Sequence, residues 1–541
     1  MTSLPLNLGP SSFPYPSRRM PVHASRGVVA TSEPLAAQAG LSMLQAGGSA
    51  VDAALATAIA LTVVEPTSNG IGADAFALVW DGEKLHGLNG SGRSPKTHTP
   101  ELFRGLGHRE VPGRGWLPVT VPGAPGTWRD LHARFGRLPF EQLFEPALHY
   151  AEHGFPVAPV TANGWAGSAR SFKESLTGPE YRGWFETFAP DSSGPKPGDV
   201  RALPDHGRTL RLIAASKALA FYEGELAEKI ARFAAETNGY LTRDDLAAHT
   251  STWVEPIGTS YRGFDVWEIP PNGQGIAALI ALNVLEGFDL AKHKRDSEES
   301  FHLQIESMKL GFIDAQRYVA DQEHALVPVS GLLNKEYGAS RRGMIGHDAI
   351  DPRPGEPSRG GTVYLCAADS EGMMVSYIQS NYQGFGSGVV VPGTGIALQN
   401  RGHGFSLDPS HPNVVAPGKR PFHTIIPAFL TEGGRAVGPF GVMGGHMQPQ
   451  GHLQMVVNQV DYGLNPQAAL DAPRWYWLDG KRVHLEPGAQ PLLEPLRARG
   501  HAAEIAPAAG AYGKGQIIRR LENGSYVAGS EPRADGCAVG F

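Results

Sequence analysis

One threonine stands at an abrupt change in sequence character and is the strongest candidate for chemistry. Residues 348–361 carry three prolines and five charged residues without periodicity, which is typical of a linker, and they end in Gly360-Gly361. Thr362 follows directly and begins a β-rich run that extends to Ala368. A hydroxyl needs a nearby base to attack a carbonyl, and a free α-amino group, with a reference pKa of about 7.7–8.0, can act as one. A cut before Thr362 would place that amine and the hydroxyl on one residue.

Helices and strands on both sides of this threonine are expected to build its surroundings. Ser32–Ala46 is expected to form a helix with Ser32 as its N-cap, and the spacing of Ser49 and Asp52 predicts a capping box for a second, Ala-rich helix. Asp81-Gly82 between two β-rich runs predicts a hairpin. Longer helices are expected over residues 276–290 and 297–320. The pattern favours a helical first part and a sheet-rich second part packed together as α/β.

Composition and charge exclude several classes of protein. Hydrophobic residues make up 41% and charged residues 18% of the 541 residues, which is ordinary for a globular protein. The net charge of -6 argues against a nucleic-acid partner. The two cysteines form no CxxC pair, so the fold is not expected to depend on disulfides. The N-terminus lacks an apolar signal region and the longest apolar run, residues 53–64, is too short to span a bilayer, which favours a cytoplasmic protein without a membrane partner.

The 20 histidines raise the question of a metal site. Several of them gather in the last third of the chain, at His403, His411, His423, His446 and His452. No HExxH motif or carboxylate spacing joins them, and the glycines of residues 384–388 lack a P-loop lysine. We therefore expect neither a metal nor a cofactor.

A linked set of motifs occurs in a fixed order along the chain. The motifs are Gly47–Ala53, Glu65-Pro66, Gly361–Asp369, Gly384–Gly388, Lys419–Pro421, Gly444-Gly445 and Asp461–Asn465. In order and spacing they resemble the gamma-glutamyltranspeptidases over roughly Gly27 to the C-terminus, and such a set is far more specific than any single motif. The segments His423–Pro427 and Gly441–Gly445 are similar to the lidless, glutathione hydrolase-like bacterial branch of that family.

The resemblance implies a fold and a maturation step. The fold is α/β, a four-layer αββα sandwich of the N-terminal-nucleophile hydrolase type. The precursor is expected to cut itself between Gly361 and Thr362. The chain then divides into an irregular N-terminal arm, a large-subunit segment and a small-subunit segment, which are residues 1–26, 27–361 and 362–541. The large and small segments are expected to form one domain together.

The resemblance also assigns catalytic roles to four residues. Thr362 matches the family's nucleophile, and Ser380 falls where the family has a hydroxyl residue that supports it. Gly444 and Gly445 match the glycines whose backbone N–H groups stabilise the oxyanion of an acyl-transfer reaction. Without the resemblance, a glycine pair such as this would be read as a tight turn.

The predicted acyl pocket departs from the family pattern in its charged residues. Ser91 occupies the position of the arginine that binds the substrate α-carboxylate, with Arg93 two residues further on. Gly404 occupies the position of the acidic residue that binds the α-amino group. A lost charged contact is typically worth about 1.5–3 kcal/mol, so strict γ-glutamyl selectivity is not expected. The residues expected to line the pocket are Arg93, Asn381, Tyr382, Arg401, His403, His423 and Thr424.

The implied activity is hydrolysis of γ-glutamyl amides such as glutathione through a γ-glutamyl-Thr ester. Hydrolysis is expected to exceed transfer to an amine, because the segment Phe405–Lys419 is shorter than in members with a lid loop and leaves the site open to water. Two alternatives stay open: a related amidohydrolase acting on glutaryl or cephalosporin side chains or on poly-γ-glutamate, and an uncleaved relative that only binds such ligands. The expected partners are a small γ-glutamyl substrate and the two subunits of one precursor, and a homo-oligomer is left open.

Self-cleavage can be tested directly. Purified protein should give two bands on a denaturing gel, one of them a fragment of about 19 kDa from the 57.7 kDa chain, with Thr362 as its first residue. Thr362→Ala removes the attacking hydroxyl and should leave a single chain. N-terminal sequencing of the small fragment provides the check, and a fragment that begins at any other residue would contradict the prediction.

Overall fold

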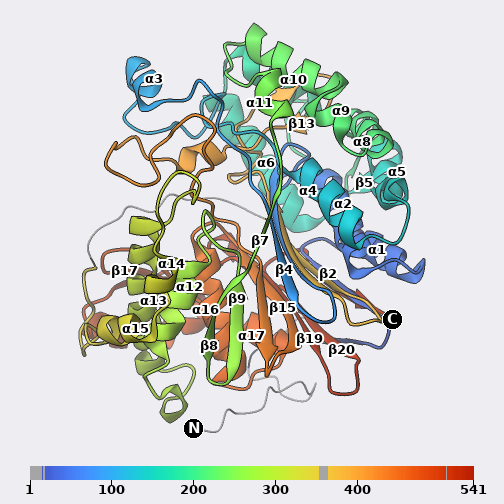
Figure 1. Cartoon of the computed structure of the whole chain (residues 1–541). Coiled ribbons are helices and arrows are strands. Elements are labelled where there is room, and N and C mark those ends of the chain that lie inside the picture. Colours follow the sequence, from blue (N-terminus) through green and yellow to red (C-terminus); the bar gives the residue numbers. More distant parts are fainter. Residues whose placement is uncertain (1–14, 16–18, 353–362, 507–508) are drawn as a thin grey trace.

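Two large sheets form the centre of the molecule. The computed structural model describes residues 15, 19–352, 363–506 and 509–541, so Gly361 and Thr362 lie outside the described residues, as does most of the expected linker. Both sheets are seven-stranded and antiparallel, and they pack against each other around the main hydrophobic core (Figure 1). The expectation of a mixed α/β fold is confirmed.

Both sheets contain strands from before and after position 362. The first sheet runs in the order β1, β20, β19, β15, β14, β9, β8, and the second in the order β21, β2, β10, β11, β3, β4, β7. The strands of the first sheet are β1 (Val22–Ala24), β8 (Ile257–Tyr261), β9 (Phe264–Glu268), β14 (Ala428–Glu432), β15 (Arg435–Met443), β19 (Lys514–Arg520) and β20 (Tyr526–Ser530). The strands of the second are β2 (Val28–Thr31), β3 (Asp74–Trp80), β4 (Leu85–Gly90), β7 (Thr252–Val254), β10 (Val363–Ala368), β11 (Met374–Ser380) and β21 (Cys537–Gly540).

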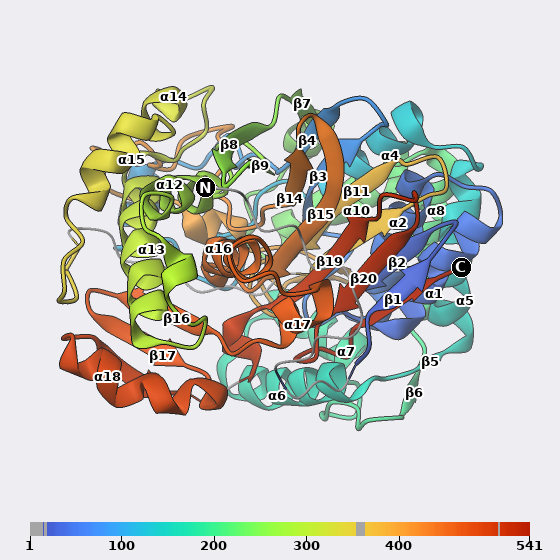
Figure 2. The ribbon, with the colours of Figure 1, turned by 90° about the horizontal axis from the view of Figure 1, so that it is seen from below.

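Each sheet has its own helices on its outer face. Helices α1 (Pro34–Gln45) and α2 (Ala50–Val64) pack against β2, β10 and β11 of the second sheet. Helices α12 (Ile276–Leu285), α16 (Met447–Val460) and α17 (Pro466–Asp471) pack against the first, with α13 (Glu298–Tyr318) against α12. Viewed from below, the strands lie between α12 and α13 on one side and α1 on the other (Figure 2).

Shorter elements complete the chain. The remaining helices are α3 (Pro100–Gly105), α4 (Ala124–Phe135), α5 (Glu145–His153), α6 (Pro159–Ser175), α7 (Arg182–Phe188), α8 (Pro204–Ser216), α9 (Leu219–Tyr222), α10 (Glu225–Glu236), α11 (Arg243–Ala247), α14 (Val329–Leu332), α15 (Lys335–Arg342) and α18 (Leu493–Ala498). Small sheets are formed by β5 (Phe155–Pro156) with β6 (Val200–Arg201), by β12 (Val390–Val391) with β13 (Ile396–Ala397), and by β16 (Trp475–Asp479), β17 (Arg482–Leu485) and β18 (Ala502–Ile505). No helix of the described ranges combines the length and the apolar character that a membrane span requires.

The start of α2 forms as its sequence predicts. Ser49 Oγ accepts the N–H of Asp52 at 3.2 Å and Asp52 Oδ2 accepts the N–H of Ser49 at 2.9 Å, so the capping box is confirmed. The whole helix is buried, and Gly40 of α1 lets it approach closely, because a Cβ at Gly40 would lie 2.2 Å from Thr57 Oγ1. Close packing of these two Ala-rich helices fixes the layer that lies over β10 and β11.

Other boundaries differ from the sequence predictions. Glu33, not Ser32, is the N-cap of α1, because its carboxylate accepts the N–H of Ala36 while the Ser32 hydroxyl donates to Glu65. Helix α12 ends at Leu285, five residues early, and a 3₁₀ turn follows over Leu290–Lys292. Residues 22–24 of the expected N-terminal arm form β1, which pairs with β20. The hairpin of β3 and β4 is confirmed.

Candidate active site

The candidate site lies where β11 ends. Thr362 itself is outside the described residues, but β10 begins with the next residue, Val363, which pairs with Gln379. The following residue of β11 is Ser380, which pairs on its other side with Asp74 of β3 and is fully buried. Ser380 Oγ accepts the N–H of Tyr382 at 2.8 Å. The predicted supporting hydroxyl therefore lies at the end of the strand beside the one that follows the predicted nucleophile.

The turn after β11 is strained and polar. Tyr382 has φ of 78°, a left-handed conformation that a bulky side chain rarely adopts. Asn381 is buried, and its Nδ2 donates to the carbonyl of Asn69 at 3.1 Å. Among the described residues its Oδ1 has no hydrogen-bond partner. Strain and an unpaired amide oxygen at one turn are typical of a site that binds a ligand.

Arg401 is the buried cation of the site. It begins the 3₁₀ turn Arg401–Gly404 and is 1% exposed. Its Nη1 donates to Thr424 Oγ1 at 2.6 Å, and its guanidinium carbon lies 4.7 Å from the ring centroid of Tyr382. Burial lowers the pKa of Arg401 to about 10, with Asp74 opposing the shift, so the group stays charged at neutral pH. Arg401, Thr424 and Tyr382, all predicted pocket residues, are thus in contact.

Asp74 and His423 form a buried acid–imidazole pair. Asp74 Oδ1 accepts the N–H of Gly123 at 3.1 Å, and its Oδ2 lies 3.2 Å from His423 Nε2. Burial raises the pKa of Asp74 to about 7, although Arg401 opposes this. Burial, helped by the charge of Arg401, holds the pKa of His423 well below its ordinary value. His423 is therefore neutral, and the geometry favours Nε2–H as the donor to Asp74 while Nδ1 accepts the N–H of Ile425 at 3.4 Å.

Gly444 and Gly445 make the turn between β15 and α16. Both have positive φ, 132° and 61°, which glycine adopts without the strain of a side chain. Their carbonyls accept the N–H groups of the next helical turn, whereas neither of their own N–H groups meets an acceptor within the part of the chain that the structure describes. Two free N–H groups at the start of a 14-residue helix suit an oxyanion.

Gln274 holds this turn to the pocket. Its Nε2 donates to the carbonyl of Thr424 at 2.6 Å and to the carbonyl of Gly445 at 2.9 Å, while its Oε1 lies 3.2 Å from His446 Nδ1. Burial lowers the pKa of His446 to about 3, with Arg401 adding to the shift, so this ring is also neutral. A chain of direct contacts therefore runs from Gly445 through Gln274, Thr424, Arg401 and Tyr382 to Ser380.

Two predicted pocket residues lie at the margin of this cluster. Arg93 Nη2 is 2.9 Å from Glu323 and its Nη1 is 3.7 Å from Asp321, so its charge is directed to acidic residues of another loop. His403 is half-buried, its Nδ1 lies 2.5 Å from the carbonyl of Val111, and its ring centroid is 6.3 Å from that of Tyr382. The structure thus brings Ser380, Tyr382, Arg401, His423 and Thr424 together and connects Arg93 elsewhere.

Comparison with known proteins identifies the family. The gamma-glutamyltranspeptidase family model matches residues 36–541. The chain belongs to this family. Among solved structures, the cephalosporin acylase from Bacillus halodurans superposes with a TM-score of 0.94 at 54% identity, over 98% of this chain and 99% of that chain. The glutathione hydrolase-like YwrD proenzyme of Bacillus subtilis is 36% identical over 96% of this chain and 99% of its own length. The oxamate amidohydrolase proenzyme of Klebsiella pneumoniae is 32% identical over the same shares.

Three residues of the site were not predicted from the sequence as site residues. Asp74 begins an apolar strand. The available signal was a lone carboxylate in the apolar run Gly72-Ala73-Asp74-Ala75-Phe76, because buried carboxylates are rare. Gln274 and His446 carry no such signal. Their role depends on hydrogen bonds between segments separated by 172 positions, which only the fold brings together.

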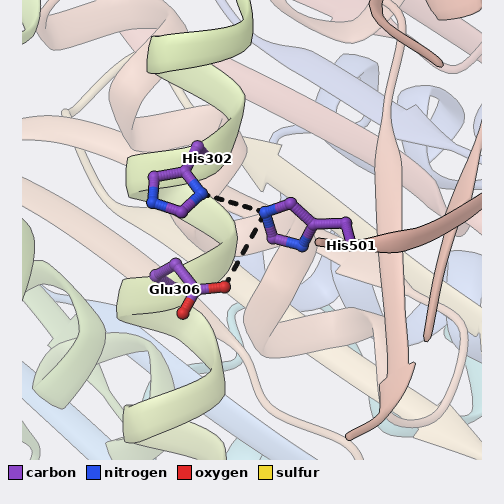
Figure 3. Close-up of side chains that lie close together, drawn as sticks. All are labelled: His302, Glu306 and His501. Atoms are coloured by element: carbon purple, nitrogen blue, oxygen red, sulfur yellow. Dashed lines mark hydrogen bonds and ion pairs between the residues drawn. The ribbon is translucent and has the colours of Figure 1, made fainter. Parts of the chain in front are cut away.

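A second cluster of ionisable groups lies away from this site, on α13 and before β18. His302 Nδ1 is 2.9 Å from His501 Nε2, which is 3.8 Å from Glu306 Oε1, and all three residues are buried (Figure 3). Three such ligands could hold a cation. Lys309 Nζ, however, lies 2.7 Å from Glu306 Oε1, so the carboxylate already has a cation and a metal would have to displace it. The expectation of no metal stays a prediction.

Replacing Gln274 tests whether the glycine turn must be held in place. Gln274→Met should lower kcat about 10-fold with little change in KM, because the turn loses the donor that fixes the Gly445 carbonyl but keeps both N–H groups. Gln454→Met is the matched control, since this buried glutamine of α16 also donates to two carbonyls but contacts neither glycine. Equal losses of kcat in both variants, or none in Gln274→Met, would contradict the assignment.

Replacing Asp74 tests the buried acid. The ordinary pKa of an aspartate is about 3.9, and a pKa raised to about 7 means that the folded protein binds the proton more tightly than the unfolded chain. Stability from this group therefore falls as pH rises between about 4 and 7. Asp74→Asn mimics the protonated form, so its Tm should exceed that of the wild type by about 2–4 °C at pH 8 and match it near pH 4. A Tm difference that is the same at both pH values would refute this.

Proposed function

We propose that the chain is a self-processing amidohydrolase that cleaves γ-glutamyl amides with Thr362 as its nucleophile, in the manner of a glutathione hydrolase. The observation that carries the proposal is the glycine turn, whose two N–H groups meet no acceptor among the described residues and which is joined by direct contacts to Ser380 at the end of β11. Strand β10, which begins one residue after Thr362, is the neighbour of β11 in the sheet.

The proposed reaction proceeds in two acyl transfers. The Thr362 hydroxyl attacks the amide carbonyl carbon while its own α-amine takes the hydroxyl proton, and the N–H groups of Gly444 and Gly445 stabilise the oxyanion. The C–N bond breaks, the amine leaves with that proton, and an ester to Thr362 remains. Water, deprotonated by the same amine, then attacks the ester. The acid is released as the ester C–O bond breaks and the hydroxyl is restored.

Maturation uses the same Thr362 hydroxyl on the chain itself, while the α-nitrogen of Thr362 is still part of the peptide bond and receives the proton when that bond breaks. The Thr362 hydroxyl attacks the Gly361 carbonyl, the peptide C–N bond breaks to give an ester, and water releases the carboxylate of Gly361 and the free amine of Thr362. We infer that the two pieces, residues 27–361 and 362–541, stay together as a four-layer αββα sandwich of the N-terminal-nucleophile type. In support, each sheet contains strands from both pieces, and each sheet has helices on one face.

A related acylase activity is the second candidate. It is supported by the 54% identical structure, which is that of a cephalosporin acylase from Bacillus halodurans. It is also supported by the pocket, because Gly404 offers no carboxylate to a substrate α-ammonium. The third reading, an uncleaved relative that only binds ligands, is tested by the denaturing gel.

The balance between hydrolysis and transfer tests the proposal. Residues 405–419 are short and packed down, with Phe405, Leu407 and Val415 against Phe103 and Val111, which supports a site open to water. With γ-glutamyl-p-nitroanilide as donor, p-nitroaniline should be released by the processed wild type and not by Thr362→Ala. Added glycylglycine should raise the release less than about twofold, because water competes freely for the ester. A processed enzyme that releases no p-nitroaniline from any acyl anilide would refute the proposed function.

A further inference from the structure

Arg401 differs from other buried arginines in what its donors meet. Its Nη1 donates to the Thr424 hydroxyl, but Nε and Nη2 are buried and have no hydrogen-bond partner among the described residues. No carboxylate of those residues lies within 4.0 Å of the Arg401 guanidinium. The acidic residue that acts on its charge is Asp74, whose two oxygens are hydrogen-bonded to Gly123 and His423. By contrast, Arg474 meets Glu531 and two carbonyl oxygens.

The two unpaired nitrogens form one edge of the guanidinium plane. The N–H bonds of Nε and one Nη point in parallel along that edge, and their spacing matches the two oxygens of a carboxylate. A buried cation with unsatisfied donors is costly, so a fold that retains it normally satisfies it with a bound group. The form of the edge therefore suits a bidentate carboxylate.

The charges around Arg401 indicate which kind of carboxylate-bearing acyl group fits beside it. His423 and His446 are both neutral, and position 404, three residues away in the same turn, has no side chain. An ammonium group near Arg401 would meet a buried cation, and the nearby carboxyl of Asp74 is already hydrogen-bonded to Gly123 and His423. A γ-glutamyl group carries such an ammonium beside its carboxylate, whereas the acyl group of a plain dicarboxylic acid does not.

The place of Arg401 limits the length of the acyl chain. Arg401 contacts Tyr382, whose backbone N–H donates to Ser380 Oγ. Two contacts, through Thr424 and Gln274, separate Arg401 from Gly445. Only two residues, Thr424 and Gln274, therefore link Arg401 to the glycine turn, which favours a short acyl chain between the two.

We infer that Arg401 binds a carboxylate on the acyl side of the donor through its Nε–Nη2 edge, so that the preferred donors are amides of short dicarboxylic acids that carry no α-ammonium. The inference rests on the proposed function for the chemistry, and it goes beyond it by naming the donor class and the residue that selects it. Arg401 takes the place of the carboxylate-binding arginine expected near Ser91.

Kinetics with four p-nitroanilides test the selectivity. The acyl groups differ at the end far from the amide: succinyl and glutaryl end in a carboxylate, γ-glutamyl carries an ammonium beside its carboxylate, and valeryl is uncharged. The better of the succinyl and glutaryl donors should exceed the γ-glutamyl donor in kcat/KM at least about 10-fold. Arg401→Lys keeps the charge but loses the edge, so it should lower kcat/KM for that donor about 10–100-fold and for the neutral valeryl donor less than about threefold. Arg519→Lys is the matched control: Arg519 is equally buried, but its Nε and Nη1 donate to Gln459 and to backbone carbonyls.

Binding separates this inference from the proposed function. Glutarate should bind the wild type in calorimetry at least about 10-fold more tightly than L-glutamate does, and Arg401→Lys should abolish the difference while Arg519→Lys keeps it. A wild type that prefers γ-glutamyl donors 10-fold or more, or an Arg401→Lys variant that loses valeryl and carboxyacyl turnover equally, would overturn the inference. Amide turnover that is absent while Arg401-dependent glutarate binding persists would instead remove the proposed function and leave the carboxylate site standing.

Discussion

The pairing of β10 with β2 and β11 is the constraint on which the rest of the structure depends. Val363, the first residue of β10, is hydrogen-bonded into the middle of a sheet within one residue of the expected cut. A peptide bond broken before Thr362 would therefore leave the new end anchored by β11 from Val363 and by β2 from Leu365. The antiparallel register also sets Ser380 at the end of β11 with Asp74 beside it. The same set of paired strands therefore holds the two segments together and positions Ser380 and Asp74 at the site.

Around this ladder, amides and neutral histidines do the positioning. Gln274, Asn381 and His423 can each donate and accept without carrying a charge, so they connect backbone segments at a lower desolvation cost than ions would. Because these three side chains carry no net charge, the electrostatic field of the site comes mainly from Arg401 and Asp74. A low-dielectric surrounding makes that field strong, which is what an acyl-transfer site requires.

The sequence alone predicts the local features and the family, and it fails where distant segments meet. The Ser49–Asp52 capping box, the β3–β4 hairpin and the start of α13 follow from short-range rules and are confirmed. The N-cap of α1 is misread because Ser32 finds a partner, Glu65, that lies far along the chain. The site shows the same division. Ser380, Tyr382, Arg401, His423 and Thr424 were expected from motifs, whereas Asp74 and Gln274 acquire their roles only through contacts across the fold.

The distribution of unfavourable features through the molecule supports the location of the site. Several other buried charges are paired with an opposite charge, as in Arg474 with Glu531 and Lys309 with Glu306. At the end of β11 the fold instead keeps a tyrosine at positive φ, an arginine with an open edge and an aspartate whose pKa burial raises to about 7. Each of these costs stability, of the order of 1–3 kcal/mol for a strained backbone alone. Because a charged ligand would satisfy the open edge and offset part of that cost, the clustering of such features here is better explained by binding than by folding.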